Sequence, residues 1–128
     1  GSIMETIMTV KVIWAGKSGQ EYTFETYPIG TEFNPVSGVY IACKETSPGS
    51  WEAIYVGETQ SLFDRLNAGL ANHDGLKCAN TRGATHIAAI VMNGEANRLG
   101  IETDLRHGLN PVCNKQRVTN PASLFYKR

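Results

Sequence analysis

Two tripeptides each place a tyrosine and a glycine in a short apolar run. Gly38-Val39-Tyr40 begins one run and Tyr55-Val56-Gly57 ends the next, so we expect two neighbouring strands. Either tripeptide by itself is common in β-rich proteins. Side chains able to handle charge follow at longer spacing: Arg65, Glu102 and Asn114. A guanidinium can hold a phosphate through two parallel hydrogen bonds, and a carboxylate is a hard oxygen ligand that suits Mg²⁺.

Glu102 lies in a stretch whose pattern predicts a helix. It stands between Ile101 and Leu105, so its side chain should be turned partly toward the core. A carboxylate in that position is costly unless a cation is paired with it. The alternative is an exposed helical residue, a role that Asp104 on the opposite side of the helix could fill. Taken without the other motif residues, a single helical glutamate is more often structural than functional.

Arg65 and the tyrosines also have ordinary structural explanations. An exposed arginine at this position could pair with Asp64 or Glu58, and tyrosine is frequent in strands as simple packing. A tyrosine has a pKa of about 10, so a role as a base near neutral pH requires positive charge nearby. We expect Arg65 and a cation held by Glu102 to supply that charge and to lower the pKa of Tyr40.

Roughly residues 38–114 resemble the GIY-YIG nuclease family in the order of five residues: Tyr40, Tyr55, Arg65, Glu102 and Asn114. The resemblance implies a metal-dependent endonuclease that hydrolyses DNA phosphodiester bonds with one divalent metal, Mg²⁺ or Mn²⁺. Val39 and Val56 replace the isoleucines of the family name, which is a harmless change on a strand. The chain most resembles small stand-alone bacterial or phage members, because no separate DNA-binding domain is visible in it.

The resemblance also implies a role for each matching residue. Glu102 corresponds to the glutamate that holds the divalent metal. Arg65 corresponds to the helix arginine that holds the scissile phosphate and steadies the charge of the transition state. Tyr40 matches the tyrosine proposed to activate the attacking water, and Tyr55 matches a supporting tyrosine. Asn114 matches a late asparagine that helps to shape the site.

Three further residues near the motif enter the predicted site. His73 falls where many family members carry a polar residue or a histidine, and it is either a proton shuttle or a solvated loop residue. Gly57 would let the backbone approach the site closely. Thr59 either contacts phosphate through its hydroxyl or caps the following helix. The predicted catalytic residues are Tyr40, Tyr55, Arg65, Glu102 and His73, and the predicted substrate-binding residues are Gly57, Thr59, Arg65 and Asn114.

These residues require a small sheet with helices packed against it. Residues 9–14 and 21–27 are apolar or alternating and predict an N-terminal hairpin, which could serve as a lid, a dimer contact or a DNA clamp. The further predicted strands lie at residues 38–44, 53–57 and 86–92. The predicted fold class is therefore α+β: a small central antiparallel or mixed sheet flanked by helices, similar to the GIY-YIG fold, with an N-terminal hairpin.

Two helices are predicted from apolar spacing. The first begins at Thr59 or Ser61 and ends near Ala71, with an apolar stripe formed by Leu62, Phe63, Leu66 and Leu70. A loop is expected between this helix and the strand at residues 86–92. The second helix covers residues 95–107 and is closed by Gly108. Residues 110–128 have little periodicity and are expected to wrap back over the core.

Length and composition predict one globular domain. The chain has 128 residues, and we expect a tag remnant or flexible N-terminus at residues 1–8 and a single domain at residues 9–128. No apolar run approaches the roughly 20 residues that span a bilayer. The three cysteines are odd in number and lack metal-type spacing, so we expect reduced thiols in a cytoplasmic protein. They are Cys43, Cys78 and Cys113.

The charge balance leaves the function open. Twelve basic and twelve acidic residues cancel, whereas proteins that hold nucleic acid usually carry a basic excess. Either the basic groups cluster on one face, or binding is weak, or the partner is not nucleic acid. The alternatives to a DNA endonuclease are an inactive module of the same fold that binds nucleic acid or protein, and an RNA-directed nuclease. The oligomeric state is not predicted.

Overall fold

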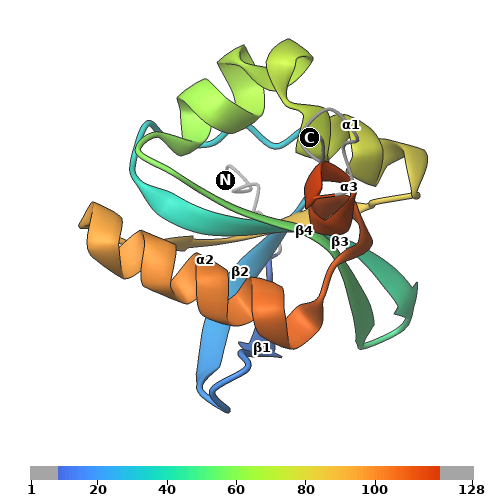
Figure 1. Cartoon of the computed structure of the whole chain (residues 1–128). Coiled ribbons are helices and arrows are strands. Elements are labelled where there is room, and N and C mark those ends of the chain that lie inside the picture. The colour runs from blue at the N-terminus through green and yellow to red at the C-terminus, as the bar shows by residue number, and fades with distance from the viewer. Residues whose placement is uncertain (1–8, 119–128) are drawn as a thin grey trace, which may run out of the picture.

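Five segments of alternating or β-branched residues form one antiparallel sheet. The strands are β1 (Val10–Ala15), β2 (Glu21–Pro28), β3 (Gly38–Ser47), β4 (Ser50–Thr59) and β5 (His86–Val91). Their order across the sheet is β1-β2-β5-β3-β4, and every neighbouring pair is antiparallel. Figure 1 shows this sheet in a computed structural model, which describes residues 9–118. The predicted tag remnant or flexible segment at residues 1–8 lies outside the described residues, as do residues 119–128 of the predicted domain.

Strand β3 is deeply buried, because β4 and β5 pair with its two edges and both of its faces are covered by core residues. Its first six residues are all buried, and alternate side chains enter two separate cores. Tyr40 and Ala42 face one core, whereas Val39 and Ile41 face the other. Tyr55 on β4 pairs with Ala42 and joins the first core. The two motif tyrosines therefore share one face of the sheet, and they lie on neighbouring strands as the sequence predicts.

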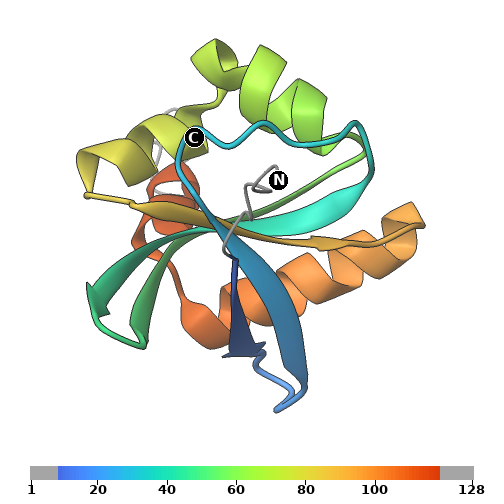
Figure 2. The ribbon, with the colours of Figure 1, turned by 180° about the vertical axis from the view of Figure 1, so that it is seen from behind.

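Helical segments cover both faces of the sheet, as Figures 1 and 2 show from opposite sides. The face that carries Tyr40 and Tyr55 packs against η1 (Asp64–Ala68), η2 (Leu70–Asn72), α1 (Asp74–Thr81) and α3 (Val112–Val118). The other face packs against α2 (Glu95–Leu109), whose Leu105 is fully buried. The predicted α+β class, with an N-terminal hairpin and helices against an antiparallel sheet, is confirmed.

The N-terminal hairpin belongs to the main sheet, because β2 pairs with β5. Its turn is also tied to α2 through Asp104, whose carboxylate accepts hydrogen bonds from Ser18 N (2.8 Å), Ser18 Oγ (2.7 Å) and Tyr22 Oη (2.7 Å). The hydrogen bond from Tyr22, followed by those from Ser18, lowers the pKa of Asp104. Gly16 in the turn has no room for a side chain, since a Cβ there would overlap this carboxylate. Asp104 is therefore an anchor for the hairpin and not the exposed residue that the sequence suggested.

The helix predicted from Ser61 to about Ala71 is interrupted. Helical backbone begins at Leu62, but Gly69 N donates to Asp64 O, five residues earlier (2.7 Å), so η1 is wider than an α-helix. The chain then forms the short turn η2. Leu70 is consequently 43% exposed and does not continue the apolar stripe.

Helix α1 occupies a segment that the sequence analysis predicted as a loop. It begins directly after His73, whose Nδ1 accepts a hydrogen bond from Leu76 N (3.2 Å) and so caps the helix. Histidine is not among the usual capping residues, which explains why the sequence gave no clear start signal. The run from Asn72 to Gly75 therefore begins a new helix in addition to ending the previous one.

The predicted end of α2 and the predicted irregular C-terminal stretch also need correction. Helix α2 continues through Gly108 to Leu109, and Asn110 adopts the left-handed conformation (φ 53°) that ends it. The chain then forms α3 within the stretch that showed little periodicity, and α3 packs back on the core through Cys113, as expected for the start of this stretch. Seven residues are too few to reveal a clear helical period in a sequence.

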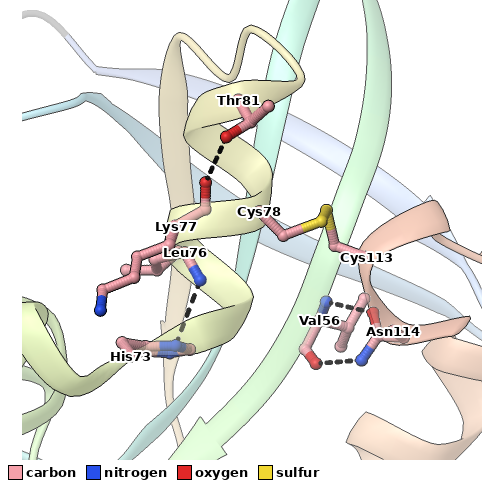
Figure 3. The surroundings of a disulfide bond; sticks show 8 residues. All are labelled: Val56, His73, Leu76, Lys77, Cys78, Thr81, Cys113 and Asn114. Atoms are coloured by element: carbon pink, nitrogen blue, oxygen red, sulfur yellow. Dashed lines mark hydrogen bonds between the residues drawn. A yellow bond between two sulfur atoms is a disulfide. The ribbon is translucent and has the colours of Figure 1, made fainter. Parts of the chain in front are cut away.

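A disulfide joins Cys78 on α1 to Cys113 on α3 (Figure 3). The prediction of three reduced thiols is therefore wrong for this pair, whereas Cys43 is a buried free cysteine. The two bonded cysteines are separated by 35 positions, and only the packing of α1 beside α3 brings them together. Within residues 9–118, no helix is both long and apolar enough to cross a membrane.

Candidate active site at the edge of β4

Four of the predicted catalytic residues line one cleft. Tyr40 comes from β3, Tyr55 from β4, Arg65 from η1 and Glu102 from α2. The cleft has a volume of about 210 Å³ and lies beside β4, which is the last strand of the sheet. Helical segments from both faces can therefore reach the same edge. The remaining residues that line the cleft are Gly57, Glu58 and Leu99.

The ring of Tyr40 depends on the absence of a side chain at Gly57. The two residues pair across β3 and β4, and a Cβ at Gly57 would overlap the Tyr40 hydroxyl. Gly75, in the first turn of α1, has the same relation to the ring of Tyr55. Each motif tyrosine thus packs against a glycine, which explains the close approach of the backbone predicted for Gly57.

His73 lies behind Tyr40 and is fully buried, so the predicted alternative of a solvated loop residue is wrong. Its Nε2 is 2.6 Å from Tyr40 Oη. Because Nδ1 accepts the Leu76 N–H, the neutral imidazole carries its proton on Nε2 and donates it to Tyr40. The imidazole ring also meets Tyr40 and Tyr55 edge-on, with ring centroids 5.7 and 5.4 Å apart.

The protein groups around Tyr40 do not produce the lowered pKa that the sequence analysis expected. Burial of the ring raises the pKa of Tyr40, and the neighbouring Tyr55 raises it further. The hydrogen bond and the positive charge of Arg65 lower the pKa, but their effect is smaller than that of burial. Tyr40 is therefore a neutral phenol at neutral pH.

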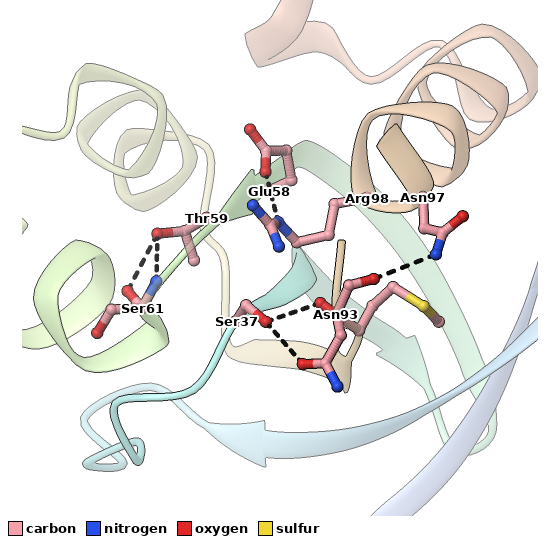
Figure 4. A network of polar contacts seen from close by, with 8 residues as sticks. Ser37, Glu58, Thr59, Ser61, Asn93, Asn97 and Arg98 are labelled. Atoms are coloured by element: carbon pink, nitrogen blue, oxygen red, sulfur yellow. Dashed lines mark hydrogen bonds and ion pairs between the residues drawn. The ribbon is translucent and has the colours of Figure 1, made fainter. Parts of the chain in front are cut away.

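Arg65 does not form an ion pair with Asp64 or with Glu58, the two partners considered from the sequence. Glu58 pairs instead with Arg98 of α2, whose Nε lies 2.9 Å from Glu58 Oε1 (Figure 4). Within the described part of the chain, no carboxylate lies within ion-pair distance of Arg65. Its guanidinium instead contacts the Tyr40 hydroxyl, as the pKa of Tyr40 reflects.

Helix α2 presents a stripe of alternating charge to the edge of β4. Arg98, Glu102 and Arg106 stand four residues apart, so they share one face of the helix. Arg98 is almost fully buried in its pair with Glu58, while Arg106 Nε lies 3.0 Å from Glu102 Oε2. Glu102 is 15% exposed, which confirms that its side chain is turned mostly inward. The spacing of Arg98, Glu102 and Arg106 is visible in the sequence. Glu58, which pairs with Arg98 and lines the cleft, was not predicted as a site residue.

The oxygen donors of the cleft fit a magnesium or manganese ion whose coordination shell is completed by water and substrate oxygens. Among the described residues, no group of three His, Cys, Asp or Glu side chains could hold a metal ion. Mg²⁺ is usually bound by one or two carboxylates together with waters and substrate phosphates. Glu102 offers Oε1, because Oε2 is taken by Arg106 and the contact of Oε1 with Thr103 is long (3.5 Å).

Asn114 supports the cleft from outside. Its Oδ1 accepts from Val56 N (2.8 Å) and its Nδ2 donates to Val56 O (2.9 Å), as Figure 3 shows. The side chain thereby replaces the neighbouring strand that an edge strand lacks. It fixes β4 directly before Gly57 and does not itself line the cleft.

Thr59 also acts on the backbone. Its hydroxyl accepts from Ser61 N (3.0 Å) and donates to Ser61 O (3.1 Å), and Figure 4 shows this pair. Ser61 Oγ in turn accepts from Asp64 N (3.1 Å), so the two hydroxyls organise the start of the helical segment that carries Arg65. Ser61 therefore caps the helical segment, and Thr59 fixes the backbone of Ser61 without capping the helix itself.

No protein-family model, curated protein or solved structure matches this chain. The cleft combines two phenols, a guanidinium and two carboxylates, one of which, Glu58, is paired with Arg98. Such a set can bind a phosphate, hold a divalent cation and orient a water molecule.

Proposed function

We propose that this protein is a metal-dependent endonuclease that hydrolyses DNA phosphodiester bonds in the manner of the GIY-YIG nucleases. The observation that carries the proposal is the convergence of Tyr40, Tyr55, Arg65 and Glu102 in one cleft. These residues come from four different elements and span 63 sequence positions, from 40 to 102, counted inclusively. The pairing of β3 with β4 accounts for the meeting of the two tyrosines, but it does not require Arg65 and Glu102 to join them. A phosphodiesterase site uses such charges to bind phosphate and a cation.

Arg65 is assigned to the scissile phosphate. Its planar guanidinium can bind two phosphate oxygens at once and can stabilise the negative charge that develops on them. It stands in η1, whose wide turn is of a kind often found at functional sites. The cap formed by Ser61, whose backbone is bonded by Thr59, holds the start of this segment, so the guanidinium is positioned before substrate binds.

Tyr40 is assigned to the attacking water. His73 Nε2–H donates to Oη and the positive charge of Arg65 acts on the same hydroxyl, so the proton of the hydroxyl itself is left for an acceptor in the cleft. At neutral pH the neutral phenol can orient a water molecule. As the pH rises, a growing fraction of phenolate can also accept the proton of that water.

Glu102 is assigned to a divalent cation, Mg²⁺ or Mn²⁺. When bound, such an ion supplies Lewis-acid stabilisation of charge on the phosphate. Arg106 holds Oε2 and fixes the carboxylate, while the pair of Arg98 with Glu58 fixes α2 against β4 one turn earlier. Tyr55, Asn114 and Thr59 complete the proposal as positioning residues.

Two other functions use the same geometry. The balanced charge of the chain favours a catalytically inactive module that binds nucleic acid or protein, and an RNA-directed nuclease would use the same residues. The cytoplasmic location expected from the sequence rested on three reduced thiols. The disulfide between Cys78 and Cys113 is more typical of oxidising compartments.

The function class is tested with supercoiled plasmid DNA and a single-stranded RNA of mixed sequence, each incubated with the protein in Mg²⁺, in Mn²⁺ and in EDTA. We expect nicking of the plasmid in both metals and none in EDTA. Cleavage of the RNA in place of the plasmid would move the assignment to an RNA nuclease. Absence of cleavage on both substrates would support the inactive binding module.

A further inference from the structure

A second depression lies beyond the candidate active site, where the C-terminal end of α2 meets the turn between β1 and β2. Its volume is about 420 Å³. Four of its seven lining residues are basic or can be protonated, and none of them is acidic. The lining residues are Lys17, Arg106, His107, Asn110, Pro111, Asn114 and Lys115, and we call this surface the basic groove.

Three separate elements build the basic groove. Lys17 comes from the β1–β2 turn, Arg106 and His107 from the last turn of α2, and Lys115 from α3. The turn is held in place because Lys17 N donates to Asp104 O (3.0 Å) and the Asp104 carboxylate binds Ser18 and Tyr22. The groove is thus a rigid part of the fold.

Arg106 of the groove is paired with Glu102, but the two lysines of the groove carry positive charge with no carboxylate partner among the described residues. Within residues 9–118, no carboxylate lies within ion-pair distance of Lys17 or Lys115, and both residues are exposed. The nearest carboxylates along α2 are occupied, Asp104 by the hairpin and Glu102 by Arg106. Basic residues at the end of α2 also stabilise the helix dipole. That explanation does not extend to Lys17 and Lys115, which come from other elements.

The groove begins where the candidate active site ends. Arg106 lines the groove and binds Glu102, which lines the cleft, and the two residues are one helical turn apart. The four positions from Glu102 to Arg106 rise about 6 Å along the helix, which corresponds to roughly two nucleotides at the rise of duplex DNA. Asn114 forms a second link, because it lines the groove while it holds Val56 beside Gly57 of the cleft.

We infer that the basic groove binds the phosphodiester backbone of a nucleic-acid strand on one side of the scissile bond, with Lys17 and Lys115 as its phosphate contacts. The inference rests on the proposed function, since it takes the strand to pass through the cleft. It gives the N-terminal hairpin the role of a clamp, one of the three roles left open by the sequence. It also reconciles zero net charge with nucleic-acid binding, because the free positive charge is concentrated beside the site.

The test measures binding apart from cleavage. A fluorescein-labelled 20-base-pair duplex is titrated with protein in EDTA, and its anisotropy is followed over a series of salt concentrations. The slope of log K against log salt counts the phosphates engaged. We expect Lys17→Ala/Lys115→Ala to weaken binding and to reduce the magnitude of this slope by about 2. The matched control Lys11→Ala/Lys77→Ala removes two exposed lysines outside the groove and should keep the slope of the wild type.

The outcomes separate this inference from the proposed function. If Lys17→Ala/Lys115→Ala keeps the slope of the wild type, or if the control loses as much, the basic groove does not bind phosphate, whatever the plasmid assay shows. If the wild type does not bind the duplex, the inference is also wrong. If the slope falls as expected while no variant cuts plasmid, the groove is supported and the catalytic proposal fails.

Discussion

At the scale of single residues, the candidate site is a set of side chains whose partners restrict what each can do. Tyr40 receives a hydrogen bond from buried His73 and is kept neutral by burial, so it is an orienting group at neutral pH and a base only in alkali. Glu102 has one oxygen held by Arg106. Arg65 stands without a carboxylate partner in the described structure, which leaves its guanidinium available to a phosphate.

Arg65→Lys should slow plasmid cleavage at least about 100-fold, close to the effect of Arg65→Ala, because a point charge cannot make the two-pronged phosphate contact. Arg82→Lys, a change at an exposed arginine at the end of α1, is the matched control and should cut at the rate of the wild type. The measurement is the initial rate of nicking in Mg²⁺. Recovery of most of the activity by Arg65→Lys would reduce Arg65 to a source of general positive charge.

Tyr40→Phe should lower the cleavage rate by roughly 10²- to 10⁴-fold, the usual range for an acid–base group. The free energy of unfolding should fall by about 1 kcal/mol, because the hydrogen bond with His73 is lost. The raised pKa predicts that the rate of the wild type increases with pH in the alkaline range, and that Tyr40→Phe lacks this increase. Tyr27→Phe, on the half-buried Tyr27, is the control. Unchanged activity in Tyr40→Phe would make Tyr40 a packing residue.

At the scale of elements, α1 and α3 act as a unit that supports the site. The disulfide joins them, His73 caps α1 behind Tyr40, and Asn114 follows Cys113 to hold the edge of β4. These two helices were missed in the sequence because α3 is short and the cap of α1 is a histidine. The strands were predicted well because alternation and the two tripeptides mark them directly.

Reduction of the disulfide should lower the free energy of unfolding by up to about 4 kcal/mol, because the bond closes a loop of 35 residues in the unfolded chain. Urea unfolding with and without dithiothreitol measures this difference. Cys43→Ala removes the buried free thiol and should respond to the reductant as the wild type does. Cys78→Ser/Cys113→Ser should show no response. An equal response in that double variant would place the effect of the reductant elsewhere.

At the scale of the whole molecule, function depends on how both faces of the sheet meet at one edge. The sequence placed Tyr40, Tyr55, Arg65 and Glu102 on their elements, and the order of the motif predicted that they form one site. It could not reveal Glu58 as the partner of Arg98, because that pair depends on α2 packing against β4. The basic groove is likewise a tertiary feature, since its lysines lie at opposite ends of the chain.

The protein should lose stability in alkaline solution as a whole. Burial raises the pKa of Tyr40. The pKa of Tyr22 is raised to about 12, mainly by burial and to a smaller extent by its hydrogen bond to Asp104. The unfolded chain releases these protons near pH 10. The contribution of the two phenols to the free energy of unfolding should therefore be constant below pH 10, and the free energy of unfolding should fall above it.

Urea unfolding between pH 9 and 11 tests this sign. Tyr40→Phe should have a shallower decline above pH 10, by about 1.4 kcal/mol per pH unit where the unfolded phenol is ionised. Both proteins carry Cys43→Ala, so that no free thiolate can exchange with the disulfide. The same slope in both proteins would contradict the raised pKa of Tyr40.

The central claim is that phosphodiester hydrolysis takes place in the cleft at the edge of β4, and Glu102→Gln tests it most directly. This change keeps the shape of the side chain and removes the charge that would hold the cation. The rate of plasmid nicking in Mg²⁺ and in Mn²⁺ is measured for the wild type, for Glu102→Gln and for the control Glu52→Gln. Glu52 is an exposed glutamate at the end of β4 that lies away from the cleft. We predict that the wild type and Glu52→Gln cut equally well while Glu102→Gln, folded and equally stable to urea, shows no cleavage in either metal. Nicking by Glu102→Gln at the rate of the wild type would contradict the account.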